Sequence, residues 1–225
     1  HFTGPHTLEV DGRNYEAGII VLATGAHPRR LSLEGSEQLI SNQQFFELTE
    51  LPHRILFAGG GYVAFELAHI AAACGSQVTI VSRDEEPLET FDPELVEILI
   101  RSALKKGIHF RLGQQVKSIR KEDGGYLARI TNVRNGETQP EPADLVVHAA
   151  GRLPHLQMLN LDAAGIPYTE DGVEVNEQLR STGHPDVYAP GDSNGSWPFT
   201  SVGQYEGVIV AHNILHEYKR DVDYT

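Results

Sequence analysis

The sequence predicts an α/β fold: a parallel sheet covered by helices, with an antiparallel β-meander inserted into it. Three observations support this prediction. Apolar runs of strand length alternate with helical segments, which is typical of parallel sheets. Residues 55–81 have the order strand, glycine turn, helix, strand, at about the length of one βαβ unit. Residues 115–141 contain short turns between strand-like segments, which favours the meander.

The first 28 residues predict a hairpin and then a buried strand. Segments 7–10 and 14–17 flank Asp11-Gly12, a dipeptide that favours a two-residue hairpin turn. Residues 19–23 form a continuous apolar run, so we expect a strand buried on both faces. The run ends in a turn, Thr-Gly-Ala-His-Pro, at 24–28.

The later elements are marked by turn and capping residues. In the βαβ unit, strand 55–58 leads into a helix that continues to about residue 73, and strand 77–81 follows. Asp92 and Pro93 begin the next helix and Gly107 ends it. Further elements are predicted in this order: strand 108–112, the meander with turns at 123–125 and 135–136, strands 145–150 and 187–189, and a helix from about 202 to 218.

The glycine turn at 59–61 has the spacing of a dinucleotide-binding motif, Gly59-x-Gly61-x-x-Ala64. Gly59 permits the tight turn, Gly61 lets a pyrophosphate approach the backbone, and Gly60 is the variable position between them. The third position must be small so that the helix packs on the strand, and Ala64 satisfies this. Taken alone, the motif could be a turn without a ligand. Its place in a βαβ unit favours a phosphate held at the helix N-terminus.

The second strand of this unit ends where a side chain should contact the adenosine ribose. Ser82 and Arg83 stand there, and a hydroxyl and a guanidinium both suit the 2′-phosphate of NADP. One alternative is a solvated arginine at a strand end. Another is Asp84, which could accept hydrogen bonds from the 2′-hydroxyl of NAD. We therefore expect NADP(H), with NAD(H) as the alternative.

Composition argues against several classes of function. The net charge is −13 and no cluster of Lys and Arg is present, so no nucleic-acid partner is expected. No apolar run approaches ~18 residues, so no membrane span is expected. The single cysteine, Cys74, excludes an intrachain disulfide, fits a reducing cytoplasm and is expected to be a small buried residue. The eleven histidines are scattered, and neither His69 nor His212 has a second ligand at metal spacing, so we expect no metal.

Four motifs in order carry a resemblance to a known family: VLATGAHP, GGGYVAFELA, AAGRLPH and VYAPGDSNG. The chain resembles the pyridine nucleotide–disulfide oxidoreductases, flavoproteins similar to glutathione reductase, mercuric reductase and dihydrolipoamide dehydrogenase. This resemblance implies a Rossmann-like FAD/NAD(P)-binding fold. It divides the chain into the end of the first FAD-binding segment (1–36), the NAD(P)-binding domain (37–153) and the returning FAD-binding segment (154–225).

The resemblance also implies which residues contact the cofactors. Asp192 would accept hydrogen bonds from the sugar-alcohol chain of the flavin, and Thr200 would lie beneath the flavin ring. The full FAD set is Ala23, Thr24, Gly25, Gly191, Asp192 and Thr200. The NADP set is Gly59, Gly60, Gly61, Tyr62, Val63, Glu66, Ser82, Arg83, Ala150 and Gly151.

Some of these assignments have alternatives. Tyr62 is similar to an aromatic gate between nicotinamide and flavin, or else is a core tyrosine. Glu66 is similar to a glutamate near the nicotinamide, and its apolar neighbours favour a buried position. Arg152 is either structural or in contact with the flavin. Glu89 stands where members that use NADPH often carry a second arginine, which keeps NAD open as the alternative.

The function implied is hydride transfer from NADPH to FAD and then to a disulfide or related small-molecule acceptor, in a homodimer formed through a C-terminal domain. The family's redox cysteine pair and first FAD glycine loop are not among these residues. No catalytic residue is therefore assigned, and the chain looks like the central part of a family member. By itself it is expected to bind flavin weakly and to be inactive. The alternatives are a module that only binds NAD(P), and a non-disulfide relative such as an NADH oxidase or ferredoxin reductase.

Overall fold

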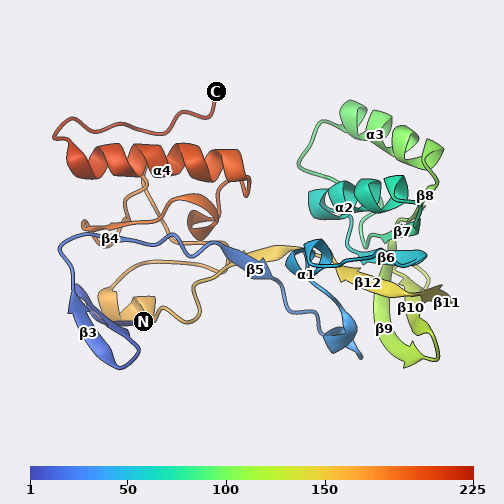
Figure 1. Cartoon of the computed structure of the whole chain (residues 1–225). Helices are drawn as coiled ribbons and strands as arrows, with labels where there is room; N and C mark the ends of the chain where they lie inside the picture. The colour runs from blue at the N-terminus through green and yellow to red at the C-terminus, as the bar shows by residue number, and fades with distance from the viewer. The chain divides into compact units, whose positions relative to one another are not determined.

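The computed structural model describes residues 1–225 and divides them into two compact units (Figure 1). The central unit is Pro28–Gly151, and the split unit combines His1–His27 with Arg152–Thr225. The first division falls nearer the N-terminus than the expected boundary at 36, because residues after Pro28 attach to the central unit. The carbonyl of Glu34 accepts a hydrogen bond from the Ile119 N–H at 2.8 Å.

The central unit is built on a four-stranded parallel sheet in the order β12-β6-β7-β8. The predicted βαβ unit is confirmed as β6-α2-β7. The elements around the sheet have the following bounds: η1 (Ser36–Gln38), α1 (Asn42–Phe46), β6 (Arg54–Ala58), α2 (Tyr62–Ala73), β7 (Gln77–Val81), α3 (Pro93–Lys105), β8 (Ile108–Arg111) and β12 (Leu145–His148).

The predicted meander is confirmed as an antiparallel sheet in the order β11-β10-β9. Figure 1 shows it on the side of the parallel sheet opposite α2 and α3. Alternate residues of the buried strands face the two sides: Phe57 packs in the core beneath the helices, whereas Leu56 packs in the core shared with the meander. The meander strands are β9 (Gln114–Glu122), β10 (Gly125–Asn132) and β11 (Thr138–Ala143).

The two predicted helices of the central unit, α2 and α3, begin and end at the residues expected. The Asp92 carboxylate accepts hydrogen bonds from the N–H groups of Glu94 and Leu95, which caps α3. Gly75 and Gly107 follow α2 and α3 with φ of +96° and +80°, a backbone region that favours glycine. These local signals explain why α2 and α3 could be placed from sequence, whereas α1 was not predicted.

The split unit contains the predicted hairpin and the last helix. Asp11 and Gly12 both have positive φ, 50° and 75°, as a two-residue primed turn requires. The last helix, α4, begins at Thr200 rather than at 202. The bounds are β1 (Phe2–Gly4), β2 (Thr7–Val10), β3 (Arg13–Glu16), β4 (Ile20–Val21), β5 (Ala26–Pro28), β13 (Arg152–Pro154), η2 (Leu161–Ala164), β14 (Val187–Tyr188), η3 (Gly191–Asn194) and α4 (Thr200–Leu215).

The prediction of a strand at 19–23 buried on both faces is wrong. The strand β4 covers only Ile20–Val21 and pairs in parallel with β14 in a two-stranded sheet. Ile20 and Leu22 are buried, whereas Ile19 and Val21 are 46% and 43% exposed. This strand therefore has one covered face. None of the helices is long and apolar enough to cross a membrane.

Candidate functional site

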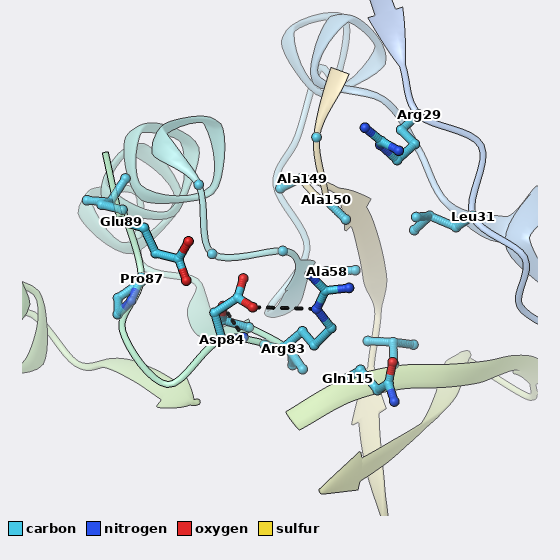
Figure 2. A pocket seen from close by; sticks show the side chains of 18 of the residues that line it. Arg29, Leu31, Ala58, Arg83, Asp84, Pro87, Glu89, Gln115, Ala149 and Ala150 are labelled. Carbon is cyan, nitrogen blue, oxygen red and sulfur yellow. Dashed lines mark hydrogen bonds and ion pairs between the residues drawn. The ribbon is translucent and has the colours of Figure 1, made fainter. Parts of the chain in front are cut away.

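A pocket of about 730 Å³ lies within the central unit, at the carboxyl ends of the parallel strands. Its floor comes from the residues that follow β6, β7 and β12. The chain runs from β6 outward to β8 and returns with β12 on the other side of β6. Open α/β sheets bind ligands at such a reversal of strand order. Figure 2 shows the pocket with its lining side chains.

The glycine turn forms one wall of the pocket. Gly59 has a φ of +124°, and a Cβ there would overlap the Ala149 carbonyl. At Gly60 a Cβ would lie 2.5 Å from the Ser82 Oγ, so the expectation that this position is variable is wrong. At Gly61 a Cβ would meet nothing within 4 Å. The turn thus needs two glycines for its own packing, while Gly61 leaves its backbone open to the pocket.

The N-terminus of α2 lies at the same turn. Gly61 is its N-cap, and a glycine has no side chain that could cap the first N–H groups of the helix. A helix start of this kind favours an anion. Ala64 is fully buried in the core beneath the helix, together with Phe57 and Ala68. The small third position therefore does what the motif predicts, since it lets the helix approach the sheet.

The residues after β7 form the second wall. Ser82 is 2% exposed, and its Oγ accepts a hydrogen bond from the Asp84 N–H at 3.3 Å. The Arg83 Nε donates to the Asp84 carboxylate at 3.4 Å, the contact drawn as a dashed line in Figure 2. Arg83 and Asp84, the two alternative contacts for the adenosine ribose, therefore form an ion pair with each other. Glu86 and Glu89 also line this part of the pocket.

Two residues of the expected NADP set do not line the pocket. Val63 is half-buried and packs against the core beneath α2. Glu66 is exposed on α2, so the expectation of a buried position is wrong. The structure brings the other eight together along the pocket: Gly59, Gly60, Gly61, Tyr62, Ser82, Arg83, Ala150 and Gly151.

Several pocket residues were missed from the sequence. Figure 2 labels Arg29 and Leu31, from the start of the central unit, and Gln115, from β9. Lys117 of β9 also lines the pocket. Neither segment carries a nucleotide-binding motif. The only available signal was the pair of arginines that follows the VLATGAHP motif. Arg29 and Lys117 add two cationic side chains to Arg83.

The expected FAD residues lie in the split unit, at one edge of the β4–β14 pair. Thr24 and Gly25 follow β4, and Gly191 and Asp192 follow β14, so both turns stand at carboxyl ends of parallel strands. Of the remaining two, Ala23 is an exposed residue two positions after the end of β4, and Thr200 is the first residue of α4.

Arg152 connects these two turns. Its Nη2 donates to the Ala26 carbonyl at 2.7 Å, and its Nη1 lies 3.8 Å from the Asp192 carboxylate. Its Nε and the Ser193 Oγ are buried without a hydrogen-bond partner. Buried polar atoms are nearly always paired in proteins. These two unpaired donors, one on the arginine beside Asp192 and one on the residue that follows it, therefore fit a polar ligand at this edge.

Cys74 is exposed, so the expectation of a buried cysteine is wrong. It follows the last residue of α2, where the helix has ended and the chain turns through Gly75. No group of three or more His, Cys, Asp or Glu side chains is arranged to hold a metal ion. The absence of a metal stays a prediction.

Comparison with known proteins gives consistent results. The model of the family described as pyridine nucleotide-disulphide oxidoreductase matches residues 1–212. The mercuric reductase of Staphylococcus aureus is 32% identical over 224 residues, which cover 99% of this chain and 41% of that protein. The glutathione reductase of Burkholderia cepacia is 32% identical over 212 residues, which cover 94% and 46%. The chain spans less than half the length of these curated relatives.

Among solved structures, the HOCl-induced flavoprotein disulfide reductase RclA from Escherichia coli is similar in fold. The TM-score is 0.86 at 25% sequence identity, and the match covers 98% of this chain and 50% of that one. This likeness extends through both units, since almost the whole chain is matched.

Proposed function

Because the chain belongs to the pyridine nucleotide-disulphide oxidoreductase family, we propose that it forms part of an enzyme that reduces FAD with NADPH. FAD would accept a hydride, two electrons and a proton, from the nicotinamide and pass the electrons to a disulfide or related small molecule. The observation that carries this proposal is the pocket at the carboxyl ends of β6, β7 and β12, walled by the glycine turn.

The central unit would bind the nucleotide. The open backbone at Gly61 and the uncapped start of α2 would hold the pyrophosphate. Ser82 and Arg83 would bind the 2′-phosphate, which is why we propose NADPH rather than NADH as the reductant. Ala150 and Gly151 would lie along the nicotinamide half, with Tyr62 beside it. Val63 and Glu66, which lie outside the pocket, have only the resemblance as support.

The split unit would bind FAD. The Asp192 carboxylate would accept hydrogen bonds from hydroxyl groups of the flavin's sugar-alcohol chain, and Arg152 would hold that carboxylate in place. Ala23, Thr24, Gly25 and Gly191 would form the backbone surface beside it. The uncapped start of α4 at Thr200 would stabilise negative charge on the flavin.

The electron acceptor, the assembly and the location are parts of the same proposal. A disulfide or a small molecule is supported by the family and by relatives described as mercuric and glutathione reductases. We propose a homodimer in the cytoplasm, the first from the family resemblance and the second from a chain with one cysteine.

A second candidate function is a module that only binds NAD(P). All residues that line the pocket belong to the central unit, which supports nucleotide binding by this unit without residues of the split unit. A third is a non-disulfide relative such as an NADH oxidase or ferredoxin reductase. The presence or absence of a Cys-x-x-x-x-Cys pair in the full chain distinguishes this third candidate from the first.

The deciding experiment uses the full chain that contains these residues. We expect a yellow protein with flavin bands near ~370 and ~450 nm, and loss of the ~450 nm band when NADPH is added without oxygen. A full chain that purifies without flavin and binds none when FAD is added, yet still binds NADPH, would establish the binding module instead.

A further inference from the structure

Glu206 is a fully buried carboxylate on α4, in the split unit. Burial of a charged group costs a large free energy unless hydrogen bonds replace its water. The sequence alone does not predict this position, because Glu206 stands between Tyr205 and Gly207 with no motif around it. The nucleotide and acceptor chemistry described above does not use it.

Four donors surround this carboxylate. Its Oε2 accepts from the Gly191 backbone N–H at 2.5 Å and from the Asn194 side-chain amide at 2.9 Å. Its Oε1 accepts from the Ser196 hydroxyl at 2.8 Å and the Tyr224 hydroxyl at 2.5 Å. Each of the four donors is uncharged, so the carboxylate is held by hydrogen bonds rather than by an ion pair.

Two of these bonds end on η3, the turn that carries Asp192. Gly191 precedes Asp192 directly, and its φ of +69° places it in the left-handed region. One turn earlier on α4, Gly203 lies against the same glycine: a Cβ on Gly191 would sit 3.6 Å from the Gly203 Cα. The helix α4 and the turn η3 therefore approach closely at Gly203 and Gly191. One helical turn further along α4, Glu206 holds η3 through its two hydrogen bonds.

The same helix begins at Thr200, the other expected flavin contact. The hydrogen bonds of Glu206 thus join η3 to α4, and the bond to Tyr224 joins the segment that follows α4 to both. Burial raises the pKa of the Tyr224 hydroxyl, and its hydrogen bond to Glu206 raises it further, so this group stays a donor at neutral pH.

We infer that Glu206 is a positioning residue for FAD: it holds the Gly191–Asn194 turn against α4 and thereby sets the place of Asp192 relative to Thr200. This inference rests on the proposed function, because it assumes that Asp192 and Thr200 contact the flavin. It goes beyond that function by assigning a role to a residue that touches neither cofactor nor substrate.

The test compares two substitutions at Glu206 in the full-length holoenzyme. Glu206→Ala removes all four bonds, and we expect the Kd for FAD to rise at least tenfold, about 1.4 kcal/mol. Glu206→Gln keeps an oxygen toward Gly191, and its amide can donate to the two hydroxyls, which can turn to accept. We therefore expect Glu206→Gln to stay within about threefold of the unchanged enzyme, with the Kd for NADPH unchanged in both variants.

Val210→Ala is the matched control, because Val210 is buried on the same helix but contacts none of these groups through a hydrogen bond. It should lower the thermal midpoint of the apoprotein, as Glu206→Ala does, yet leave FAD affinity within about twofold. Equal losses of FAD affinity in Val210→Ala and Glu206→Ala at equal midpoints would show a merely structural role and overturn the inference.

Tyr224→Phe covers the case in which Glu206→Ala does not fold. It removes one of the four donors to Glu206, and we expect the Kd for FAD to rise about two- to fivefold. An unchanged Kd in Tyr224→Phe, or FAD binding by Glu206→Ala as tight as in the unchanged enzyme, overturns the inference while the proposed function stands. Failure of the unchanged full-length protein to bind FAD would instead overturn the proposed function.

Discussion

Arg83 and Asp84 pair with each other at the surface of the pocket, and their side chains are 72% and 46% exposed. Ion pairs this exposed contribute about 0–1 kcal/mol, since water competes for both groups. The pair therefore does not lock the guanidinium, which is free to turn toward a 2′-phosphate. The acidic neighbours Glu86 and Glu89 would repel such a phosphate, so the proposed affinity for NADPH would depend strongly on Arg83.

Replacing Arg83 with alanine tests this dependence. We expect Arg83→Ala to raise the Kd for NADPH at least tenfold, because two charge-assisted hydrogen bonds are lost, and to change the Kd for NADH less than twofold. Titration of intrinsic fluorescence with each nucleotide measures both constants. Arg101→Ala is the control, since Arg101 is an exposed arginine on α3 outside the pocket. If NADH binds more tightly than NADPH, and Asp84→Ala abolishes this preference, the ribose contact is Asp84 rather than Arg83.

The three glycines of the turn differ in what an added methyl group would meet. At Gly60 it would collide with Ser82, whereas at Gly61 it would point into open space. Gly60→Ala should therefore lower the thermal midpoint of the protein. Gly61→Ala should leave the midpoint within about 1 °C and raise the Kd for NADPH roughly tenfold, since only the ligand is obstructed. Calorimetry and nucleotide titration of both variants separate these effects. Tight NADPH binding by Gly61→Ala would contradict a phosphate at this turn.

Some single-residue environments could not be predicted from sequence. Glu66 has apolar neighbours along the chain, which predict burial, and Cys74 is of a residue type that is often buried, yet both side chains are exposed. Adjacent residues on a helix point in different directions, so burial depends on which face meets the sheet. The close packing at Gly60 could not be predicted either, because its neighbour Ser82 follows a different strand and is distant in sequence.

At the scale of elements, one ion pair ties the starts of β6 and β12 together below the pocket. The Arg54 guanidinium donates two hydrogen bonds to the Asp144 carboxylate, and the Arg54 backbone N–H donates a third at 2.8 Å. These bonds from the Arg54 side chain hold the pKa of the Asp144 carboxyl below its usual range. The two strands flank the point where the nucleotide is proposed to bind.

This pair predicts a dependence of stability on pH. A carboxyl whose pKa is lower in the folded chain stabilises the fold above its unfolded value, 3.8, and this contribution is lost as pH falls through the folded value. Asp144→Asn should lower the thermal midpoint by roughly 2–4 °C at pH 7. The difference should shrink as pH falls below 3.8, in melting curves recorded from pH 7 to pH 2. Glu97→Gln, on the exposed face of α3, is the control. A difference that does not change with pH would contradict this account.

The elements themselves were largely predictable. The βαβ unit, the hairpin and the meander carry local signals, such as Asp11-Gly12 and the cap at Asp92, and each forms as expected. The pocket was only half predictable. Its glycine wall has a motif, whereas Arg29 and Lys117 reach it from segments that are close only after folding. The bonds around Glu206 join residues 191 to 224 and could not be inferred from spacing.

At the scale of the whole molecule, the two units differ in how the chain builds them. The central unit is continuous and has buried cores on both faces of its sheet. The residues that enter and leave it are joined by a hydrogen bond from the Arg29 N–H to the Gly151 carbonyl at 3.0 Å. The two ends of the central unit are therefore held together by this hydrogen bond.

Separate expression of residues 28–151 tests this independence. We expect the fragment to fold cooperatively and to bind NADPH within about threefold of the affinity of residues 1–225, since the whole pocket lies inside it. Circular dichroism melting and nucleotide titration are the measurements. Residues 1–225 should bind no more FAD than the fragment does at micromolar concentration. Stable yellow protein from residues 1–225 would contradict that expectation.

The pairing of β4 with β14 has a consequence for synthesis on the ribosome. β4 ends at Val21, but its only partner begins at Val187. Chain elongation at about 5–20 residues per second leaves that edge unpaired for roughly 10–30 s. The central unit is complete earlier, and the hydrogen bond between Arg29 and Gly151 holds its two ends together. If the central unit folds first, the loop between β4 and β14 is effectively shorter, and its closure costs less entropy. β14 would then be synthesised close to β4, its partner strand.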